Sequence, residues 1–573
     1  MTAVEAPFVD DPFGDLPELL GTGEIGGKAR GLQRLSAFVK DQQAASPSDE
    51  LHLFVPPYRV ITTSHYLTFL EDNSLTLEQF KDDDDLDIAR RFLEADLPAS
   101  LVGPLWTLVT LVRVPIAVRS SSRLEDALGE PFAGIYETKM LPNHHNSPEK
   151  RFEQIAQAIK LVYASTWFAR AREYRDATGH PHHEEAMAVI LQTIVGERHD
   201  DRFYPHLSGV ARSFNYYPFG NASPEDGVVT LALGLGRIIV DEGVGWSYCP
   251  SMPRTPPPFG SVSDLLKQTQ TRFWAVDLSF TRPQDPLTAT EYMSRFDLAD
   301  AEWDETLQHL VSTYDPQRDR LWTGCAGKGA RVLDFSPLLK ASVYPVNDVI
   351  KNLLETIRER LGTPVEVEFA AILPEEPGTP AKLALVQVRP MVVNNEIVRL
   401  KEEDLTGDTV LVSSPKALGN GRRDDLNIVT YVKTDTFDAA KTRAIGDEIR
   451  THNLRLRESG QFCVLIGFGR WGSSDPWLGI PVTWGEISQA RVLVECALEE
   501  LNVELSQGSH FFHNICSFRV SYFSVKKGLE NVRFDLLSAG SVLHESPHVV
   551  TVALDKPLHV SVDGTTGRGV ITV

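Results

Sequence analysis

An arginine and three serines follow directly after an apolar run in the segment VRSSSRLEDALGEPFAGIYETK at residues 118–139. The preceding run, LVRVPIAV, is rich in β-branched residues, which predicts a buried strand that opens into a loop at Arg119. A guanidinium can donate two parallel hydrogen bonds, so Arg119 beside Ser120 suits the oxygens of a phosphate group. The local alternative is an ion pair at a strand end between Arg119 and Glu125 or Asp126.

Polar and apolar residues alternate in two later stretches, VEVEF (365–369) and LVQVRP (385–390). Side chains two apart in a strand share a face, so Glu366 lies with Glu368, and Gln387 lies with Arg389. If the two strands pair, one sheet face carries two carboxylates, an amide and a guanidinium. Mg²⁺ prefers carboxylate oxygens and usually binds one or two of them together with phosphates, which Arg389 would complement. An exposed face with cross-strand Glu–Arg pairs is the alternative.

Two glycines precede a lysine in IGGKARG (25–31). Glycines let a backbone approach a ligand closely, and Lys28 can supply a mobile positive charge. Apolar residues at helical spacing follow, which predicts a helix that begins at the glycines. A helix start with an ordinary surface lysine is the simpler alternative, and the segment does not match a Walker A motif.

These residues need a scaffold, and the 573-residue length favours roughly three or four domains. The net charge of −22 argues against nucleic acid or an anionic membrane as a partner. Five widely spaced cysteines fit a reducing compartment. The first residues do not resemble a secretory signal, and no long apolar stretch would span a bilayer, so we predict a cytoplasmic protein.

Helices and strands are predicted in irregular succession, which favours the α+β class. We expect a helix from near Thr63, a long helix over 151–178, a strand at 186–196 and a neighbouring strand at 207–217. A helix and two strands should occupy 344–392. Residues 393–425 suggest a linker or domain boundary, and a separate α/β unit should occupy about 400–573.

The motifs together resemble a known family. GGKARGLQRL, VPPYRVITTSHYLTFL, AVRSSSRLEDALGEPFAGIYET, AIKLVYASTWFARAREYR, AVILQTIV, SGVA, GLG…VDEGV and EVEFA…LVQVRP occur in that order. About two-thirds of the chain, residues 24–392, thus resembles the N-terminal nucleotide-binding region of phosphoenolpyruvate synthase and pyruvate phosphate dikinase, an ATP-grasp-type fold. The resemblance implies two ATP-grasp-like subdomains at 1–205 and 206–395, followed by a C-terminal α/β domain at 396–573.

The resemblance also implies ATP and Mg²⁺ as cofactors and assigns roles to residues. By this resemblance, Lys28 and Arg119, with Ser120 beside them, contact ATP phosphates, and Phe132-Ala133-Gly134 is a mobile loop that closes over them. Glu137 is a polar contact in the same loop strand, and Gln192 lies in the adenine-side wall.

The resemblance further implies that Glu366 and Glu368 are divalent-metal ligands. Gln387 and Arg389 would lie beside the transferred phosphoryl group.

The sequence also departs from this family. Arg237 follows GLG where the family usually has an acidic residue, which affects nucleotide orientation or choice. No Thr-Cys-His-Ala-Ala-like segment for a phosphorylated histidine occurs. About 180 residues follow the resembling region, fewer than the roughly 250 of an α/β barrel. A complete pyruvate-to-phosphoenolpyruvate cycle within this chain is therefore not expected.

The C-terminal residues offer two further motifs. His510 and His513 in SQGSHFFHN could accept phosphate or could be structural. Gly467, Gly469 and Gly472 match G-x-G-x-x-G, but no helical pattern follows, which argues against dinucleotide binding. We therefore expect an ATP- and Mg²⁺-dependent phosphotransferase that passes phosphoryl to a histidine in trans, to the C-terminal domain, or to a small molecule. The alternative is an ATP-binding regulatory module without catalysis.

Overall fold

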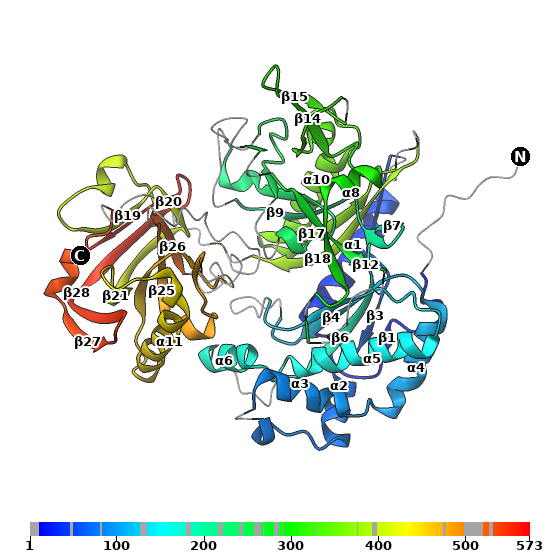
Figure 1. The fold of residues 1–573 in the computed structure, drawn as a ribbon, viewed down its shortest axis with the longest axis horizontal. Helices are drawn as coiled ribbons and strands as arrows, with labels where there is room; N and C mark the ends of the chain where they lie inside the picture. Colours follow the sequence, from blue (N-terminus) through cyan, green and yellow to red (C-terminus); the bar gives the residue numbers. More distant parts are fainter. Residues whose placement is uncertain are drawn as a thin grey trace, which may run out of the picture.

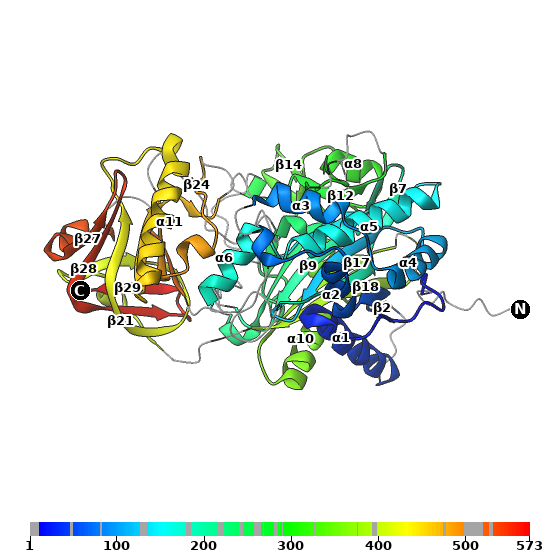
Figure 2. The same ribbon diagram turned by 90° about the horizontal axis from the view of Figure 1, so that it is seen from below.

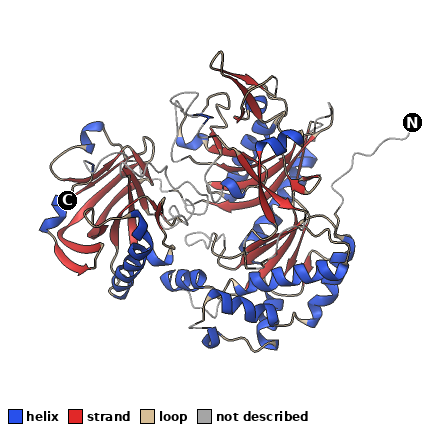
Figure 3. Ribbon diagram, viewed as in Figure 1, coloured by secondary structure: helices blue, strands red, loops and turns tan. Residues whose placement is uncertain are grey.

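The computed structural model describes residues 11–45, 50–80, 83–125, 134–178, 185–215, 222–239, 245–256, 265–266, 269–279, 285, 287–288, 290–325, 327–374, 376, 378–391, 393, 398–473, 477–497, 520–525 and 531–573. Helices and mostly antiparallel strands are mixed along this chain, which confirms the α+β class (Figures 1 and 3). In Figure 1 the C-terminal elements, coloured yellow to red, form a unit beside the rest, and the turned view of Figure 2 shows the same separation.

A five-stranded sheet lies between helices near the N-terminus, with strand order β1-β3-β6-β4-β5. Its strands are β1 (Leu19–Leu20), β3 (Tyr58–Ile61), β4 (Ile116–Ser122), β5 (Thr138–Leu141) and β6 (Met187–Thr193). One face packs on α2 (Thr63–Asp72), α3 (Asp85–Glu94), α4 (Ala99–Leu111) and α5 (Pro148–Ala164). The other face packs on α1 (Gly26–Ala45), because Ala188 and Ile190 of β6 point opposite to Val189 and Leu191.

A six-stranded sheet, in the order β11-β10-β9-β17-β18-β2, lies next to the first. Its strands are β2 (Leu51–Phe54), β9 (Leu207–Arg212), β10 (Val228–Leu233), β11 (Trp246–Tyr248), β17 (Val365–Ile372) and β18 (Ala381–Pro390). Helix α10 (Val346–Leu361) shares its apolar core, so the helix and two strands predicted for 344–392 are confirmed. Strand β2, from near the N-terminus, pairs in parallel with β18, whereas the other five strands come from residues 207–390. Two separate parts of the chain therefore build this sheet. The boundary at 205/206 stays a prediction.

Two smaller sheets extend this region. One has the order β13-β12-β8-β7 and the other β15-β14-β16. The elements are β7 (Glu197–His199), β8 (Arg202–Tyr204), β12 (Arg272–Asp277), β13 (Met293–Asp297), α8 (Leu298–Trp303), β14 (Val311–Asp315), β15 (Arg320–Thr323), β16 (Arg331–Leu333) and α9 (Ser336–Leu339). Strand β13 brings Met293 to the cavity described below, and Trp274 of β12 packs against the same apolar cluster as Met293.

The C-terminal residues form a sheet of their own, in the order β19-β29-β28-β21-β22-β25-β26-β20, with β27 on β28. The elements are β19 (Val410–Ser414), β20 (Lys416–Leu418), β21 (Gly421–Val432), α11 (Thr442–Glu458), β22 (Cys463–Phe468), β25 (Ala490–Cys496), β26 (Ser521–Val525), β27 (Ser541–Glu545), β28 (Val549–Asp563) and β29 (Arg568–Thr572). Because β19 pairs with β29 while β20 pairs with β26, segment 410–418 joins both edges and the sheet curls on itself.

Two expectations for this unit have different outcomes. The sequence predicts a linker or a domain boundary at residues 393–425. The linker interpretation is wrong from Val410 onward, because β19, β20 and the start of β21 lie there, and these strands begin the C-terminal sheet. The turn residues of this segment do form a turn, since Gly419 and Gly421 both adopt positive φ between two strands. After β22 the chain continues into the short strand β23 (Arg470–Trp471), paired with β24 (Gly479–Ile480), and not into a helix, which agrees with the argument against dinucleotide binding.

Three predicted elements nearer the N-terminus have other bounds. Strand β4 begins only at Ile116 because α4 continues to Leu111, so Arg119 lies inside the strand and not at its end. The helix expected over 151–178 breaks into α5 and α6 (Ala169–Thr178), because the hydroxyls of Ser165 and Thr166 bond to carbonyls of the preceding turn. Strand β9 is not a neighbour of β6, since the β7–β8 hairpin carries the chain to the other sheet.

Within the described ranges, none of the helices combines the length and apolarity that crossing a bilayer requires. The cytoplasmic location stays a prediction.

Candidate functional site

A cavity of about 270 Å³ lies between the five-stranded and the six-stranded sheet. Seven of the residues predicted to belong to the site line it: Lys28, Arg119, Gly134, Gln192, Glu368, Gln387 and Arg389. They come from α1, β4, the segment before β5, β6, β17 and β18. Residues that are distant in the sequence therefore face the same cavity. A shared chemical role of these residues requires such an arrangement.

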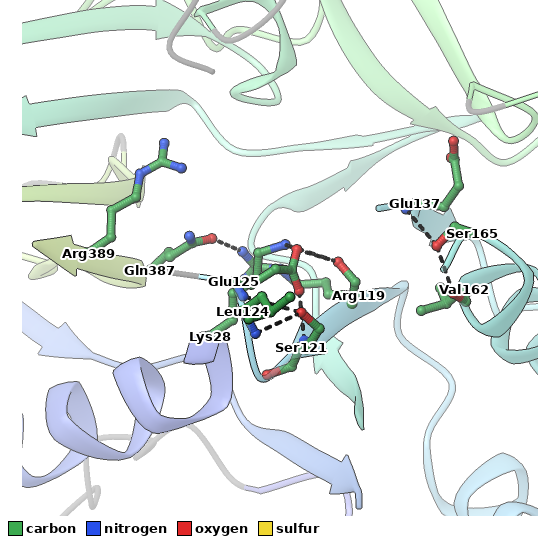
Figure 4. Close-up of polar contacts among 12 residues, drawn as sticks. Lys28, Arg119, Ser121, Leu124, Glu125, Glu137, Val162, Ser165, Gln387 and Arg389 are labelled. Carbon is green, nitrogen blue, oxygen red and sulfur yellow. Dashed lines mark hydrogen bonds and ion pairs between the residues drawn. The ribbon is translucent and has the colours of Figure 1, made fainter. Parts of the chain in front are cut away.

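Arg119 connects the two sheets (Figure 4). It lies inside β4, opposite Thr138 and Ile190, and only 8 % of it is exposed. Its Nη1 donates to Gln192 Oε1 at 2.7 Å and to the Val386 carbonyl at 3.1 Å, and its Nη2 donates to Gln387 Oε1. The buried guanidinium thus contacts an amide oxygen from each sheet.

Lys28 lies in the first turn of α1, where its ammonium meets Glu125. The Lys28 Nζ is 2.6 Å from Glu125 Oε1 and 3.0 Å from Ser120 Oγ. Glu125 is 1 % exposed and also accepts hydrogen bonds from Ser120 Oγ and the Ser122 amide. The structure therefore pairs Glu125 with Lys28, and not with Arg119 as the local alternative had it. Asp126 lies outside the described residues.

The helix start that carries Lys28 touches β4 closely. Gly26 has φ +75, and a Cβ at this position would lie 1.9 Å from the Ser121 carbonyl oxygen. The Ser121 hydroxyl accepts from the Ala29 amide and donates to the Ile25 carbonyl. These contacts give the serines after Arg119 a role in fixing α1 on the strand.

The predicted pairing of the two polar strands is confirmed. Glu366 faces Arg389 and Glu368 faces Gln387 in the β17–β18 register, and an irregularity follows Glu368. Glu368 lines the cavity, with 22 % of its side chain exposed, and one oxygen lies 3.4 Å from Arg389 Nη2. Glu366 is 1 % exposed, and both its oxygens contact guanidinium groups, those of Arg212 and Arg389.

The remaining predicted residues are not part of this group. Glu137 is beside Ser165, whose hydroxyl accepts from the Glu137 amide at 3.2 Å, and Figure 4 shows it apart from the group around Arg119. Burial raises the pKa of Glu137, against the opposing effect of Lys139, Arg170 and Arg237. Phe132 and Ala133 lie outside the described residues, as do His510 and His513.

Part of the cavity wall is apolar. Four apolar residues of the wall belong to one hydrophobic cluster: Met140, Ile194, Leu235 and Met293. Arg237 also lines the cavity, with its guanidinium 5.7 Å from the centre of the ring of Trp274, which packs against the same cluster. Such a combination of polar and apolar walls suits a ligand with a charged and a flat apolar part.

The charges in the wall favour an anion. Lys28, Arg119, Arg237 and Arg389 line the cavity, and among the described wall residues Glu368 supplies the carboxylate. No group of three His, Cys, Asp or Glu side chains within the described ranges is arranged to hold a metal ion by itself. Mg²⁺ needs no such group, because it binds through one or two carboxylates plus substrate phosphates. Glu368 fits that use, and phosphates would supply the other ligands.

Sequence reasoning missed two residues of this region. Glu125 was considered only as a partner of Arg119, and Arg212 was not considered. An acid three residues after a run of serines is a weak signal, and Arg212 follows the apolar run of β9 like any strand-end residue. The contact of Glu125 with Lys28 and that of Arg212 with Glu366 become apparent only in the folded structure.

The fold and the cavity together define an α+β protein with a cavity between two sheets that is lined by several cationic side chains. The chain belongs to the pyruvate phosphate dikinase, AMP/ATP-binding domain family, whose pattern matches residues 22–406 of the 573, well over half of the chain. This confirms the resemblance seen in the motifs.

Two curated relatives are similar to parts of the chain. A phosphoenolpyruvate synthase of Aeropyrum pernix is 29 % identical over 239 residues, which are 38 % of this chain and 25 % of the relative. An uncharacterized phosphotransferase of Bacillus subtilis, YvkC, is 27 % identical over 190 residues, which are 33 % of this chain and 20 % of the relative. The match thus spans a quarter or less of the relatives' length.

Proposed function

We propose that the protein is an ATP- and Mg²⁺-dependent phosphotransferase of the kinase or dikinase type. The observation that supports this most is the shared cavity of Lys28, Arg119 and Arg389, three cations from separate parts of the chain. Phosphoryl transfer depends mainly on positioning a polyphosphate and neutralising its charge. Membership of an AMP/ATP-binding family supports ATP as the ligand.

The proposed roles follow from position in the cavity. Lys28 and Arg119 bind phosphate oxygens, and Ser120 and Glu125 hold the Lys28 ammonium. Gln387 and Arg389 orient the transferred phosphoryl group. Gln192 lies on the nucleoside side, and Gly134, with φ +67, allows close approach of backbone to ligand. The roles of Phe132 and Glu137 stay predictions.

Glu368 is the residue that would hold Mg²⁺, together with phosphate oxygens of the nucleotide. The bound cation would neutralise charge on the phosphates and help to orient them. The protein contributes the carboxylate, the surrounding cations and a partly enclosed space.

The phosphoryl acceptor is a histidine of another protein, a C-terminal histidine such as His510 or His513, or a small molecule. A second candidate function is ATP binding without turnover, in a regulatory module. The placement of Arg237 in the cavity wall, where the resembling family usually has an acid, is the observation in its favour.

The test uses ATP labelled at the β or γ phosphate, with Mg²⁺, followed by nucleotide chromatography and intact-protein mass spectrometry. We expect ADP or AMP to form, with acid-labile mass on the wild type that His510→Ala or His513→Ala removes if these residues accept phosphoryl. Lys28→Met should abolish turnover, whereas Lys401→Met, at a side chain 79 % exposed, should not. Calorimetric binding of Mg-ATP without any product would refute transfer to water or to histidines of this chain and favour the regulatory module. Absence of binding would refute both.

A further inference from the structure

Three neighbouring strands align a row of charges beside the cavity, and one of these residues, Arg389, lines it. In the register of β9, β17 and β18, Glu366 lies opposite Arg212 on one side and Arg389 on the other. The row two residues further along consists of Val210, Glu368 and Gln387. The second row and Arg389 line the cavity, whereas Arg212 and Glu366 are not among its wall residues in the described chain.

The carboxylate of Glu366 is shared between two guanidiniums. Arg212 Nε lies 2.5 Å from Glu366 Oε2, and Arg389 Nε lies 2.6 Å from Glu366 Oε1, which also contacts Arg389 Nη2. Arg389 and Glu366 are each 1 % exposed at the side chain, and Arg212 is 13 % exposed. A buried ion pair of this kind contributes little net stability. Removal of one partner is nevertheless costly, because it leaves the other charge buried without compensation. The charge-assisted hydrogen bonds of the pair also restrict the orientation of the guanidinium groups.

A divalent cation at Glu366 would have to displace these contacts. Both oxygens already face positive groups within hydrogen-bond distance, and a cation placed there would lie next to two guanidiniums. Among the described residues Glu368 is not held in this way, because its oxygen lies 3.4 Å from Arg389 Nη2 and its side chain is 22 % exposed. The two carboxylates of VEVEF are therefore not equivalent.

We propose that Glu366 is a positioning residue and not a metal ligand, and that Arg212 acts together with it. Arg212 and Glu366 together hold the Arg389 guanidinium at the rim of the cavity, and Glu368 alone supplies the protein carboxylate for the metal. This inference rests on the proposed function, because it assigns parts within the same site.

The first test separates the two carboxylates by metal affinity without requiring turnover. Mn²⁺ binding to the full chain, saturated with a non-hydrolysable ATP analogue, is followed by electron paramagnetic resonance. We expect Glu368→Gln to weaken Mn²⁺ binding by more than about tenfold and Glu366→Gln by less than about threefold. Equal weakening by both variants would overturn this inference alone. A wild type that binds no Mn²⁺ with nucleotide would overturn the proposed function as well.

Glu366→Gln leaves two arginines facing each other, so the variant could fail to fold. The double variant Arg212→Met with Glu366→Gln removes that repulsion and is measured in the same way. It should retain Mn²⁺ affinity within about threefold of the wild type. A tenfold loss in this folded variant would also overturn the inference.

The second test addresses Arg212 through steady-state nucleotide turnover. We expect Arg212→Met to lower kcat by about tenfold or more with little change in KM, and Arg212→Lys to recover part of it. Arg202→Met is the matched control: Arg202 is 11 % exposed and pairs with the buried Asp304 at 2.8 Å in a neighbouring sheet. It should lower thermal stability without this change in kcat. A similar kcat loss in both variants would mean that Arg212 acts only structurally.

Discussion

Replacing Arg119 by lysine tests whether one guanidinium joins the two halves of the cavity. The side chain donates to Gln192 from one sheet, and to Gln387 and the Val386 carbonyl from the other. A lysine ammonium keeps the charge but concentrates its donors on one atom, so it cannot reach acceptors on both sheets with the same geometry. At least one buried acceptor then loses a charged hydrogen bond worth about 1.5–3 kcal/mol.

We therefore expect Arg119→Lys to lower the free energy of unfolding by about 2–4 kcal/mol, since a buried acceptor left unsatisfied adds to the lost bond. Loss of the planar fork should also weaken Mg-ATP binding by about tenfold or more, which corresponds to about 1.4 kcal/mol. Urea unfolding and calorimetry measure the two quantities. Arg272→Lys is the control, because Arg272 is 63 % exposed, pairs with an exposed Asp297, and should change stability by less than about 0.5 kcal/mol. If Arg119→Lys behaves like this control in both assays, Arg119 does not join the sheets in the way the contacts indicate.

Further predictions follow from single contacts. Gly26→Ala should lower the melting temperature, since φ is +75 and a Cβ would meet a carbonyl oxygen at 1.9 Å, whereas Gly103→Ala, with open space in α4, should stabilise by about 0.5–1 kcal/mol. Burial raises the pKa of Glu185 to about 6 from 4.5, so stability should fall as pH rises between these values, by about 2 kcal/mol. Urea unfolding measured across that pH range should show no such fall in the free energy of unfolding of Glu185→Gln. If this variant loses stability with pH as steeply as the wild type, Glu185 is not the group responsible. Gly485→Ala should loosen the contact of the C-terminal unit with α6, because the new Cβ would lie 2.6 Å from Glu173 Cβ, and hydrogen exchange in α6 should report it.

Local pattern was sufficient to predict the strand hairpin at the site. The alternation of VEVEF and LVQVRP determines which side chains share a face, and the observed pairing places the four polar side chains on one face as expected. The start of α1 was predictable for a similar reason, since glycines followed by a helical apolar spacing specify it within a few residues. Such features depend on neighbours in the chain.

The details that failed depend on distant partners. The position of Arg119 inside β4 is stable only because acceptors from β6 and β18 satisfy a buried guanidinium, and nothing in residues 111–125 reveals those acceptors. The break between α5 and α6 depends on two hydroxyls that bond backwards instead of continuing the helix. The ion pair between Glu366 and Arg212, over 150 residues away in the sequence, is another such contact that the local pattern of VEVEF does not reveal.

The same long-range contacts imply that folding and ligand binding are coupled at this site. The cavity wall is formed by two sheets, and Arg119 contributes to both the joint between them and the charge inside. A polyanion that binds only the joined form stabilises it by RT ln(1 + [L]/Kd), so at about one hundred times Kd the gain is about 2.7 kcal/mol. That gain is comparable to the expected cost of Arg119→Lys. Saturating Mg-ATP should therefore offset most of the stability that this variant loses, provided the variant still binds the nucleotide.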